Sequence, residues 1–227
     1  MEALIPTYIT ALCKELEELA KENPHPSLQT IFVGGGTPSL ISQDQYRFIF
    51  QTIRRNFRVD SDAEITLESN PNDLSVSYLK ELREIGFNRL SIGMQSATDK
   101  VLTLFNRRHD VQMIYDAVDF ARVAGFDNIN LDVIFGSPYE TLDDFKQTVD
   151  MLMELKPQHI SMYGLELKGG TDLRLRVDSG ELPSPDDDLF ADMYEYASEI
   201  FAQHGFGQYE ISNWCQPHRE SRHNLQY

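Results

Sequence analysis

Cysteine is nearly absent from this sequence. Only two of its 227 residues are cysteines, and neither Cys13 nor Cys215 belongs to a Cys-x-x-Cys unit. Zinc and iron–sulfur sites are usually held by several closely spaced cysteines, so the sequence offers no metal framework of its own. A disulfide between the two thiols is not expected either, because we expect the protein to reside in a reducing compartment.

Long apolar segments and positive charge are also scarce. The mean hydropathy is -0.39, and no apolar run approaches the roughly 18 residues that a membrane-spanning helix needs. Residues 1–5 are too short and too acidic for a secretion signal. The formal net charge of -16 disfavours nucleic-acid backbones and anionic membranes as main partners. We therefore expect a cytoplasmic protein.

Strand-like and helix-like segments alternate along the whole chain. Apolar residues at helical spacing predict helices over residues 4–21, 42–57, 75–85, 98–104, 111–124, 141–155 and 186–204. Short apolar runs predict strands over residues 30–33, 63–68, 89–94, 128–135, 159–163 and, as the last strand, 207–211. Residues 168–185, rich in Gly and Pro, interrupt the pattern. Repeated strand-then-helix units predict an α/β fold with parallel strands, and periodicity alone leaves open whether it is a barrel or an open sheet.

Polar side chains recur where the predicted strands end. Ligands of barrels and of open α/β sheets bind at the carboxyl ends of strands. These ends hold Gly34-Gly35-Gly36-Thr37-Pro38, Glu68-Ser69-Asn70-Pro71, Gln95-Ser96, Asp132 and Tyr163-Gly164-Leu165-Glu166. The glycine run lacks the spacing of a dinucleotide fingerprint and the lysine of a phosphate loop, but it offers bare backbone to a closely approaching ligand. One such strand end usually caps a loop, whereas several on successive units predict a binding site.

Four segments resemble the motifs of the radical S-adenosylmethionine (SAM) family that includes HemW-type heme chaperones and oxygen-independent coproporphyrinogen oxidases. They are residues 32–39 (FVGGGTPS), 65–71 (ITLESNP), 89–96 (RLSIGMQS) and 130–138 (NLDVIFGSP). Arg107-Arg108-His109 follows the third segment, and the order and spacing agree over nearly the whole chain. The resemblance implies a partial (β/α)₆ TIM-like radical SAM barrel that binds SAM across its strand ends. It also implies a [4Fe–4S] cluster in the complete proteins.

Seven positions match the family's SAM contacts, and the resemblance assigns them that role. They are Gly35, Gly36, Thr37, Glu68, Gln95, Arg107 and Asp132. The chemistry of SAM suits these side chains. A carboxylate such as Glu68 suits its ammonium, the fork of Arg107 suits its carboxylate, and Asp132 or Gln95 suits its ribose diol.

The last residues resemble the stretch that ends in His-Asn-x-x-Tyr-Trp in HemW-type proteins. The matching segments are residues 209–214 (YEISNW) and 222–227 (RHNLQY). This resemblance implies heme binding and delivery, with a heme-receiving protein as a partner, and it makes His223 a candidate heme contact because imidazole is a common axial ligand. The alternatives are an oxygen-independent coproporphyrinogen III oxidase of porphyrin biosynthesis, a non-enzymatic heme carrier, and an ordinary α/β barrel enzyme using Glu68 and Asp132 as acid and base.

The family's Cys-x-x-x-Cys-x-x-Cys segment does not occur in this sequence. In the family it follows the first barrel strand, upstream of the helix that begins here near Ile5. We therefore expect a core over residues 1–211 that lacks this strand and leaves a sheet edge unpaired, followed by the start of a HemW-type C-terminal region at 212–227. A fragment of a longer protein and a natural truncation both explain this, and we favour the fragment. Without the cluster, the chain alone is predicted to be inactive in radical SAM chemistry.

Overall fold

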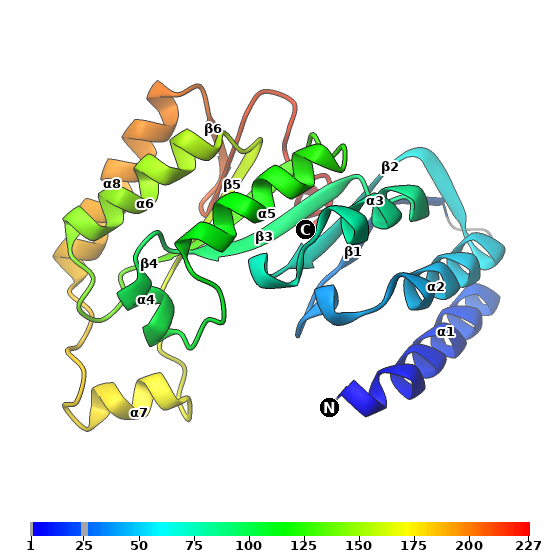
Figure 1. The fold of residues 1–227 in the computed structure, drawn as a ribbon, viewed down its shortest axis with the longest axis horizontal. Coiled ribbons are helices and arrows are strands. Elements are labelled where there is room, and N and C mark those ends of the chain that lie inside the picture. Colours follow the sequence, from blue (N-terminus) through cyan, green and yellow to red (C-terminus); the bar gives the residue numbers. More distant parts are fainter. Residues whose placement is uncertain (1, 24–26) are drawn as a thin grey trace.

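The computed structural model describes residues 2–23 and 27–227. Within them, seven strands form one sheet in the order β1-β2-β3-β4-β5-β7-β6. The strands are β1 (Ser27–Val33), β2 (Arg58–Ser69), β3 (Arg89–Gln95), β4 (Ile129–Phe135), β5 (His159–Gly164), β6 (Gly207–Glu210) and β7 (Asn213–Cys215). Strands β1 to β5 are parallel, whereas β7 runs antiparallel to β5 and β6. The sheet curves like part of a barrel wall (Figure 1).

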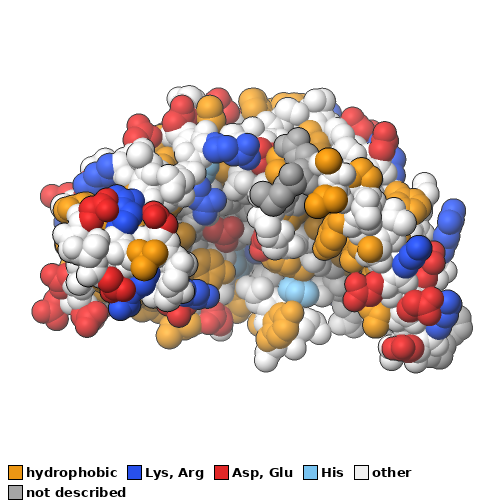
Figure 2. Space-filling model, turned by 90° about the horizontal axis from the view of Figure 1, so that it is seen from below, with side chains coloured by type: hydrophobic (Ala, Val, Ile, Leu, Met, Phe, Trp, Pro, Cys, Tyr) orange, Lys and Arg blue, Asp and Glu red, His pale blue; other side chains and the backbone are white. Residues whose placement is uncertain are grey.

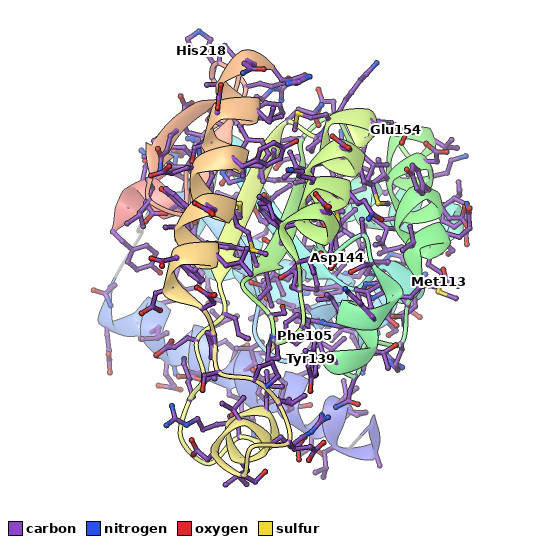
Figure 3. The ribbon with its side chains drawn as sticks, turned by 90° about the vertical axis from the view of Figure 1, so that its left-hand side faces the viewer. Phe105, Met113, Tyr139, Asp144, Glu154 and His218 are labelled. Carbon is purple, nitrogen blue, oxygen red and sulfur yellow. The ribbon has the colours of Figure 1, made fainter. Side chains whose placement is uncertain are left out.

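Most of the helices cover the outer face of the sheet, whereas the short helix over residues 172–178 buries no side chain and lies apart from the sheet (Figure 1). The helices are α1 (Ile5–Glu22), α2 (Gln43–Asn56), α3 (Val76–Ile85), α4 (Asp99–Leu104), α5 (Val111–Val123), α6 (Leu142–Leu155), α7 (Asp172–Asp178) and α8 (Asp187–Gln203). Capping boxes fix two of their starts, because the hydroxyls of Ser42 and Thr141 accept from the backbone N–H three residues on. Figure 3 shows α6 and α8 side by side, with His218 at the opposite end of the molecule from α7.

The core lies between this helical layer and the sheet. Alternate residues of the central strands are fully buried there, namely Leu67, Leu90, Ile92, Leu131, Val133 and Ile160. Because side chains on a strand alternate between faces, their sequence neighbours point to the concave side. Ser91, Asn130 and His159, from three adjacent strands, are hydrogen-bonded to one another there. The concave side is therefore polar, unlike the core.

The predicted α/β fold with parallel strands is confirmed for β1 to β5. Four elements differ from the prediction, and the first is strand β1, which begins at Ser27 rather than at residue 30. Strand β2 begins at Arg58 rather than at residue 63. The prediction missed its first half because those residues are polar and form no apolar run. The polar stretch 168–185 contains α7, which is capped by Thr171. A further strand, β7, follows the predicted last strand, and its three residues were too few for a periodic signal.

The C-terminal residues belong to the same sheet as the rest of the chain. Trp214 on β7 is buried and packs edge-on against Phe201 of α8. Since β6 and β7 pair with each other, the division predicted at residue 211 falls between two paired strands, and it stays a prediction. The first helix ends at Glu22, one residue beyond its predicted end, with Asn23 as the C-cap, while Pro24 lies outside the described residues. None of the helices in the described ranges has the length and hydrophobicity needed to cross a membrane.

Candidate functional site

A cavity of about 590 Å³ lies at the carboxyl ends of the parallel strands. Its volume falls in the range of ~300–1,000 Å³ that is usual for small-molecule sites. Six of the seven predicted SAM contacts line it: Gly36, Thr37, Glu68, Gln95, Arg107 and Asp132. Figure 2 shows the hollow between the two halves of the molecule, with acidic and basic side chains at its back. The strand-end pattern of the sequence thus converges on one cavity.

The glycine run after β1 forms one wall. A Cβ on Gly34 would lie 2.8 Å from the carboxylate of Glu68, so a larger residue there would displace that side chain. Gly35 does not line the cavity, but its N–H donates to Oε2 of Glu68 at 2.9 Å. Gly35 and Gly36 have φ angles of +83° and +65°, which favour glycine, and no atom lies within 4 Å of where a Cβ would be. The loop therefore orients Glu68 and leaves bare backbone facing open space.

Strand β3 contributes to the cavity the residues on its concave-facing side, which end with Gln95. Gln95 has a φ of 67°, a left-handed conformation that is uncommon for residues other than glycine. A Cβ on Gly93 would lie 2.7 Å from Nε2 of Gln95, so this glycine makes room for the amide. Ser91 and Gly93 also line the cavity, although the sequence reasoning missed them. Their alternation with Gln95 on one strand was the signal that could have found them.

Arg107 enters the cavity from the loop after α4. Its Nη1 donates to Oδ1 of Asn70 at 3.4 Å. Burial lowers the pKa of Arg107, and the negative charge of Asp132 opposes that shift. The guanidinium nevertheless remains charged because its intrinsic pKa is so high. The site thus holds a partly buried cation near a carboxylate.

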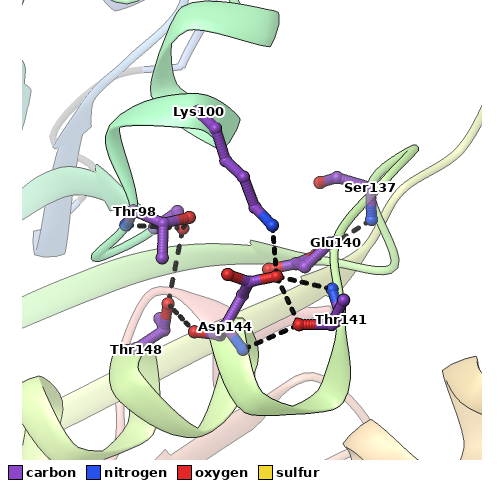
Figure 4. A network of polar contacts seen from close by, with 8 residues as sticks. Thr98, Lys100, Ser137, Glu140, Thr141, Asp144 and Thr148 are labelled. Atoms are coloured by element: carbon purple, nitrogen blue, oxygen red, sulfur yellow. Dashed lines mark hydrogen bonds and ion pairs between the residues drawn. The ribbon is translucent and has the colours of Figure 1, made fainter.

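Helix α4, which leads to Arg107, is fastened to α6. Lys100 of α4 pairs with Asp144 of α6, and the backbone N–H of Ala97 donates to Oγ1 of Thr148 at 3.0 Å. Figure 4 shows this network with Asp144 at its centre, bonded also to Thr141. These contacts set the position of the loop that carries the arginine.

Asp132 lies at the centre of the concave face. Its Oδ2 accepts from the hydroxyl of Ser91 at 2.8 Å, and its Oδ1 accepts from Nδ2 of Asn130 at 2.7 Å. The pKa of Asp132 is raised above its usual value, mainly by burial and also by the charge of Glu68, although the two hydrogen bonds and the charge of Arg89 oppose the shift. The donors around Asp132 are arranged for an ionised carboxylate that accepts hydrogen bonds.

Comparison with known proteins defines the family of the chain. The sequence profile of the radical SAM superfamily matches residues 6–152. The chain belongs to the radical SAM superfamily. It is 39% identical over 220 residues to the heme chaperone HemW of Mycobacterium tuberculosis (strain ATCC 25618 / H37Rv), covering 97% of this chain and 56% of that protein. It is 37% identical over 224 residues to the heme chaperone HemW of Bacillus subtilis, covering 98% and 59%.

The radical SAM fold also appears among solved structures. The coproporphyrinogen III oxidase HemN from Escherichia coli superposes with a TM-score of 0.86 at 29% identity, over 95% of this chain and 49% of that chain. An archaeal Elp3 from Methanocaldococcus infernus, at 17% identity and a TM-score of 0.64, shares the fold alone. The chain spans little more than half the length of its curated HemW relatives.

Radical SAM proteins use SAM and a [4Fe–4S] cluster, and the described residues fit the first of these. A carboxylate, a guanidinium, an amide and bare glycine backbone around one cavity match the ammonium, carboxylate and ribose of SAM. They do not fit the cluster. In the described ranges, no three His, Cys, Asp or Glu side chains group closely enough to hold a metal ion. Cys13 and Cys215 are buried free thiols on α1 and β7.

His223, the predicted heme contact, lies outside the SAM cavity, against β1. Its ring stacks on Phe32, with centroids 4.9 Å apart. Nδ1 lies 3.1 Å from the hydroxyl of Thr30, and Nε2 lies 3.5 Å from that of Tyr227. The backbone N–H of His223 donates to Glu64 of β2 at 3.2 Å. The C-terminal segment is thereby docked onto the first two strands of this radical SAM core.

Proposed function

We propose that this chain is the SAM-binding core of a HemW-type heme chaperone, which binds and delivers heme. The observation that carries the proposal is the convergence of six predicted SAM contacts on one cavity. Similarity to HemW proteins of 37–39% identity over nearly the whole chain supports the chaperone rather than another radical SAM activity. The [4Fe–4S] cluster belongs to the proposal as a cofactor whose cysteine ligands this sequence does not contain.

Each side chain of the cavity has a proposed task. Glu68, oriented by the N–H of Gly35, receives the ammonium of SAM, and Arg107 binds its carboxylate. Asp132 and Gln95 accept and donate hydrogen bonds at the ribose diol, while Gly36 and Thr37 line the side on which the ligand approaches most closely. When SAM is bound and reduced by a cluster, it supplies a carbon-centred radical. In this chain, the residues bind and orient the cofactor.

His223 is proposed as the heme contact. Histidines that bind metals usually have their second nitrogen held by a hydrogen-bond partner, which fixes the ring. Here Thr30 lies at Nδ1, and Nε2 has only a long contact to Tyr227. Displacement of Tyr227 frees Nε2 for iron, while Phe32 offers an aromatic surface beside the ring.

The second candidate function is oxygen-independent coproporphyrinogen III oxidation. The structural similarity to HemN favours it. The C-terminal segment, with Tyr209 and His223, favours the chaperone because it resembles HemW-type proteins. A purely non-enzymatic heme carrier stays open and is one outcome of the experiments below.

Calorimetric titration of the chain with SAM tests the cavity. We expect Arg107→Ala to weaken SAM binding about 10- to 100-fold, because hydrogen bonds to charged groups contribute roughly 1.5–3 kcal/mol. Arg58→Ala is the matched control, since Arg58 is exposed on the far end of β2. Unchanged affinity in Arg107→Ala contradicts the assignment of Arg107, and a wild-type chain that binds no SAM contradicts the function.

Heme titration followed by absorption spectroscopy tests His223. We expect His223→Ala to lose the spectrum of imidazole-ligated heme, and His204→Ala to keep it, because His204 is exposed at the end of α8. Heme binding without SAM binding favours the carrier. The chain alone, reduced anaerobically with SAM, is expected to form no 5′-deoxyadenosine, and its formation would refute the prediction of inactivity.

A further inference from the structure

A line of hydrogen bonds crosses the concave face, from the C-terminal residues to the cavity. The hydroxyl of Tyr209 lies 2.7 Å from Nε2 of His159, and Nδ1 of His159 lies 2.6 Å from Oδ1 of Asn130. Nδ2 of Asn130 lies 2.7 Å from Oδ1 of Asp132. His159 is 0% and Asn130 1% exposed, so both depend on protein partners for their hydrogen bonds.

The carboxylate fixes the direction of every bond in this line. Both oxygens of Asp132 accept hydrogen bonds, Oδ2 from Ser91 and Oδ1 from Nδ2 of Asn130, so Asn130 turns its own Oδ1 toward His159. The ring must then carry its proton on Nδ1, and its Nε2 must accept from Tyr209. All donors in the line therefore point toward Asp132.

The neighbours of His159 support a neutral ring. Its pKa is lowered to about 2, first by burial and then by the charge of Arg89 on β3. Opposite it on β7 lies Cys215, whose pKa is raised to about 11, mainly by burial, so the thiol stays protonated. An imidazolium would also direct a second N–H at the hydroxyl of Tyr209, which would then have to turn its proton away.

The far end of the line is held by the C-terminal turn. The backbone N–H of Ser221 and Nδ2 of Asn224 approach the oxygen of Tyr209 at 3.3 Å and 3.4 Å. Both are donors, so the Tyr209 proton is left for His159. His223 lies between these two residues in the chain. The turn that carries the proposed heme contact is thus bonded, through Tyr209, to the line that ends at Asp132.

We propose that His159 is a positioning residue of the SAM site: as an imidazole protonated on Nδ1, it locks the amide of Asn130 and thereby holds the Asp132 side chain in a fixed orientation for the ligand. This proposal rests on the proposed function, because there Asp132 is a SAM contact. It also implies that the C-terminal turn and the SAM cavity are coupled through Tyr209.

Nuclear magnetic resonance of the chain labelled with ¹⁵N-histidine tests the proposal without any ligand. We expect His159 to appear as the Nδ1–H tautomer and to show no titration between pH 5 and pH 8. An Nε2–H tautomer, or a ring that titrates near the ordinary value of about 6.5, would overturn the proposal. Tyr209→Phe should shift the Nε2 resonance, because it removes the donor to that nitrogen.

Calorimetry with SAM tests the effect on the cavity. We expect His159→Leu to weaken SAM binding about tenfold, since it removes the donor to Asn130 from a buried network. His159→Asn, which places an amide N–H near the position of Nδ1, should recover most of that loss. If His159→Leu does not fold, Tyr209→Phe replaces it, with an expected loss of a few-fold. Tyr115→Phe is the matched control, because its hydroxyl bonds Glu154 on the helical layer.

The outcomes separate the two proposals. Equal SAM affinity of the wild type and of the folded variants would overturn the role of His159 and leave the proposed function intact. A wild-type chain that binds no SAM would overturn the proposed function and with it the role of His159 in SAM binding, and the tautomer would then test only whether His159 holds the amide of Asn130.

Discussion

The two faces of the sheet use the same strands for different purposes. On β4, Leu131 is 0% exposed and packs in the core, while its neighbour Asp132 points the other way into the cavity. On β3, Leu90 and Ser91 divide in the same manner. One face is apolar and covered by helices, and the other is polar and hydrogen-bonded across strands. Stability and ligand binding are thus assigned to alternate residues of one segment.

This division explains how a polar interior is tolerated. Buried polar groups are costly unless they are hydrogen-bonded, and most side chains of the concave face meet that condition by bonding across strands, whereas Oγ1 of Thr66 and Nε of Arg89 have no partner in the described part of the chain. The hydroxyl of Ser161, for example, lies 3.1 Å from Oδ1 of Asn130 on β4 and 3.0 Å from Oδ1 of Asn213 on β7, so its single proton has an acceptor on either side. Substitutions on the helix-covered face should therefore change mainly stability, and substitutions on the concave face should change mainly ligand affinity.

The largest expected effect is on the helix-covered face. Leu131→Ala removes a fully buried side chain and should lower the free energy of unfolding by about 2–5 kcal/mol. The SAM affinity of the folded fraction should stay within twofold of the wild type. Chemical denaturation and calorimetry measure the two quantities. Leu175→Ala, at a position that is 58% exposed, is the control and should change neither the stability nor the SAM affinity. A loss of SAM affinity in Leu131→Ala would show that the two faces of the sheet do not have separate roles.

The neighbouring substitution should give the opposite result. Asp132→Asn keeps the shape of the side chain but removes its charge, so SAM binding should weaken by about 2–3 kcal/mol. The free energy of unfolding should change by less than about 1 kcal/mol, since the amide oxygen can still accept from Asn130 and the Ser91 hydroxyl can turn to accept from the amide NH2. Chemical denaturation and calorimetry again measure the stability and the SAM affinity. Unchanged SAM affinity would remove Asp132 from the site.

The sequence predicted the polar residues at strand ends better than the side-chain contacts between strands. Strand ends such as Glu68-Ser69-Asn70 were identified because a polar side chain follows an apolar run, and the structure gathers them at one cavity. Arg107 was identified only through the family resemblance, since a loop residue carries no periodic signal. His159 was missed as a site residue, because its partner Tyr209 lies 50 positions away in the sequence. Contacts between distant strands depend on register, which local patterns do not encode.

Glu140 sharpens the comparison because it is a buried carboxyl outside the cavity, in the loop between β4 and α6 (Figure 4). Burial raises its pKa to about 7 from 4.5, although N–H groups of Ser137 and Gly136 and the Ser137 hydroxyl oppose the shift. The folded state then binds a proton that the unfolded state has released, so stability falls as the pH rises from about 4.5 to 7.

Glu140→Gln should remove this pH dependence. We expect the variant to be more stable than the wild type by about 2 kcal/mol at pH 8 and nearly equal to it at pH 4.5. Denaturation at a series of pH values measures the difference. Glu195→Gln, on the exposed side of α8, should follow the wild-type curve. Parallel curves for Glu140→Gln and the wild type would show that Glu140 ionises normally in the folded protein.

The smallest expected effect concerns the ion pair that fastens α4 to α6. The side chain of Lys100 is 50% exposed, while that of Asp144 is 16% exposed. Burial raises the pKa of Asp144, but Lys100 and Thr141 outweigh it and leave the pKa below its usual value. The pair therefore contributes above the unfolded-state pKa and is lost as the pH falls through the folded one.

Lys100→Met should lower the free energy of unfolding by about 0.2–1 kcal/mol at low salt, and by less at high salt, because exposed charges are screened. SAM affinity should change less than twofold, since Ala97 still bonds Thr148 and keeps α4 near α6. Lys146→Met, which breaks a pair within α6, is the control. A tenfold loss of SAM affinity in Lys100→Met alone would mean that the position of Arg107 depends on this contact, and that the helical layer shapes the ligand site as well as the core.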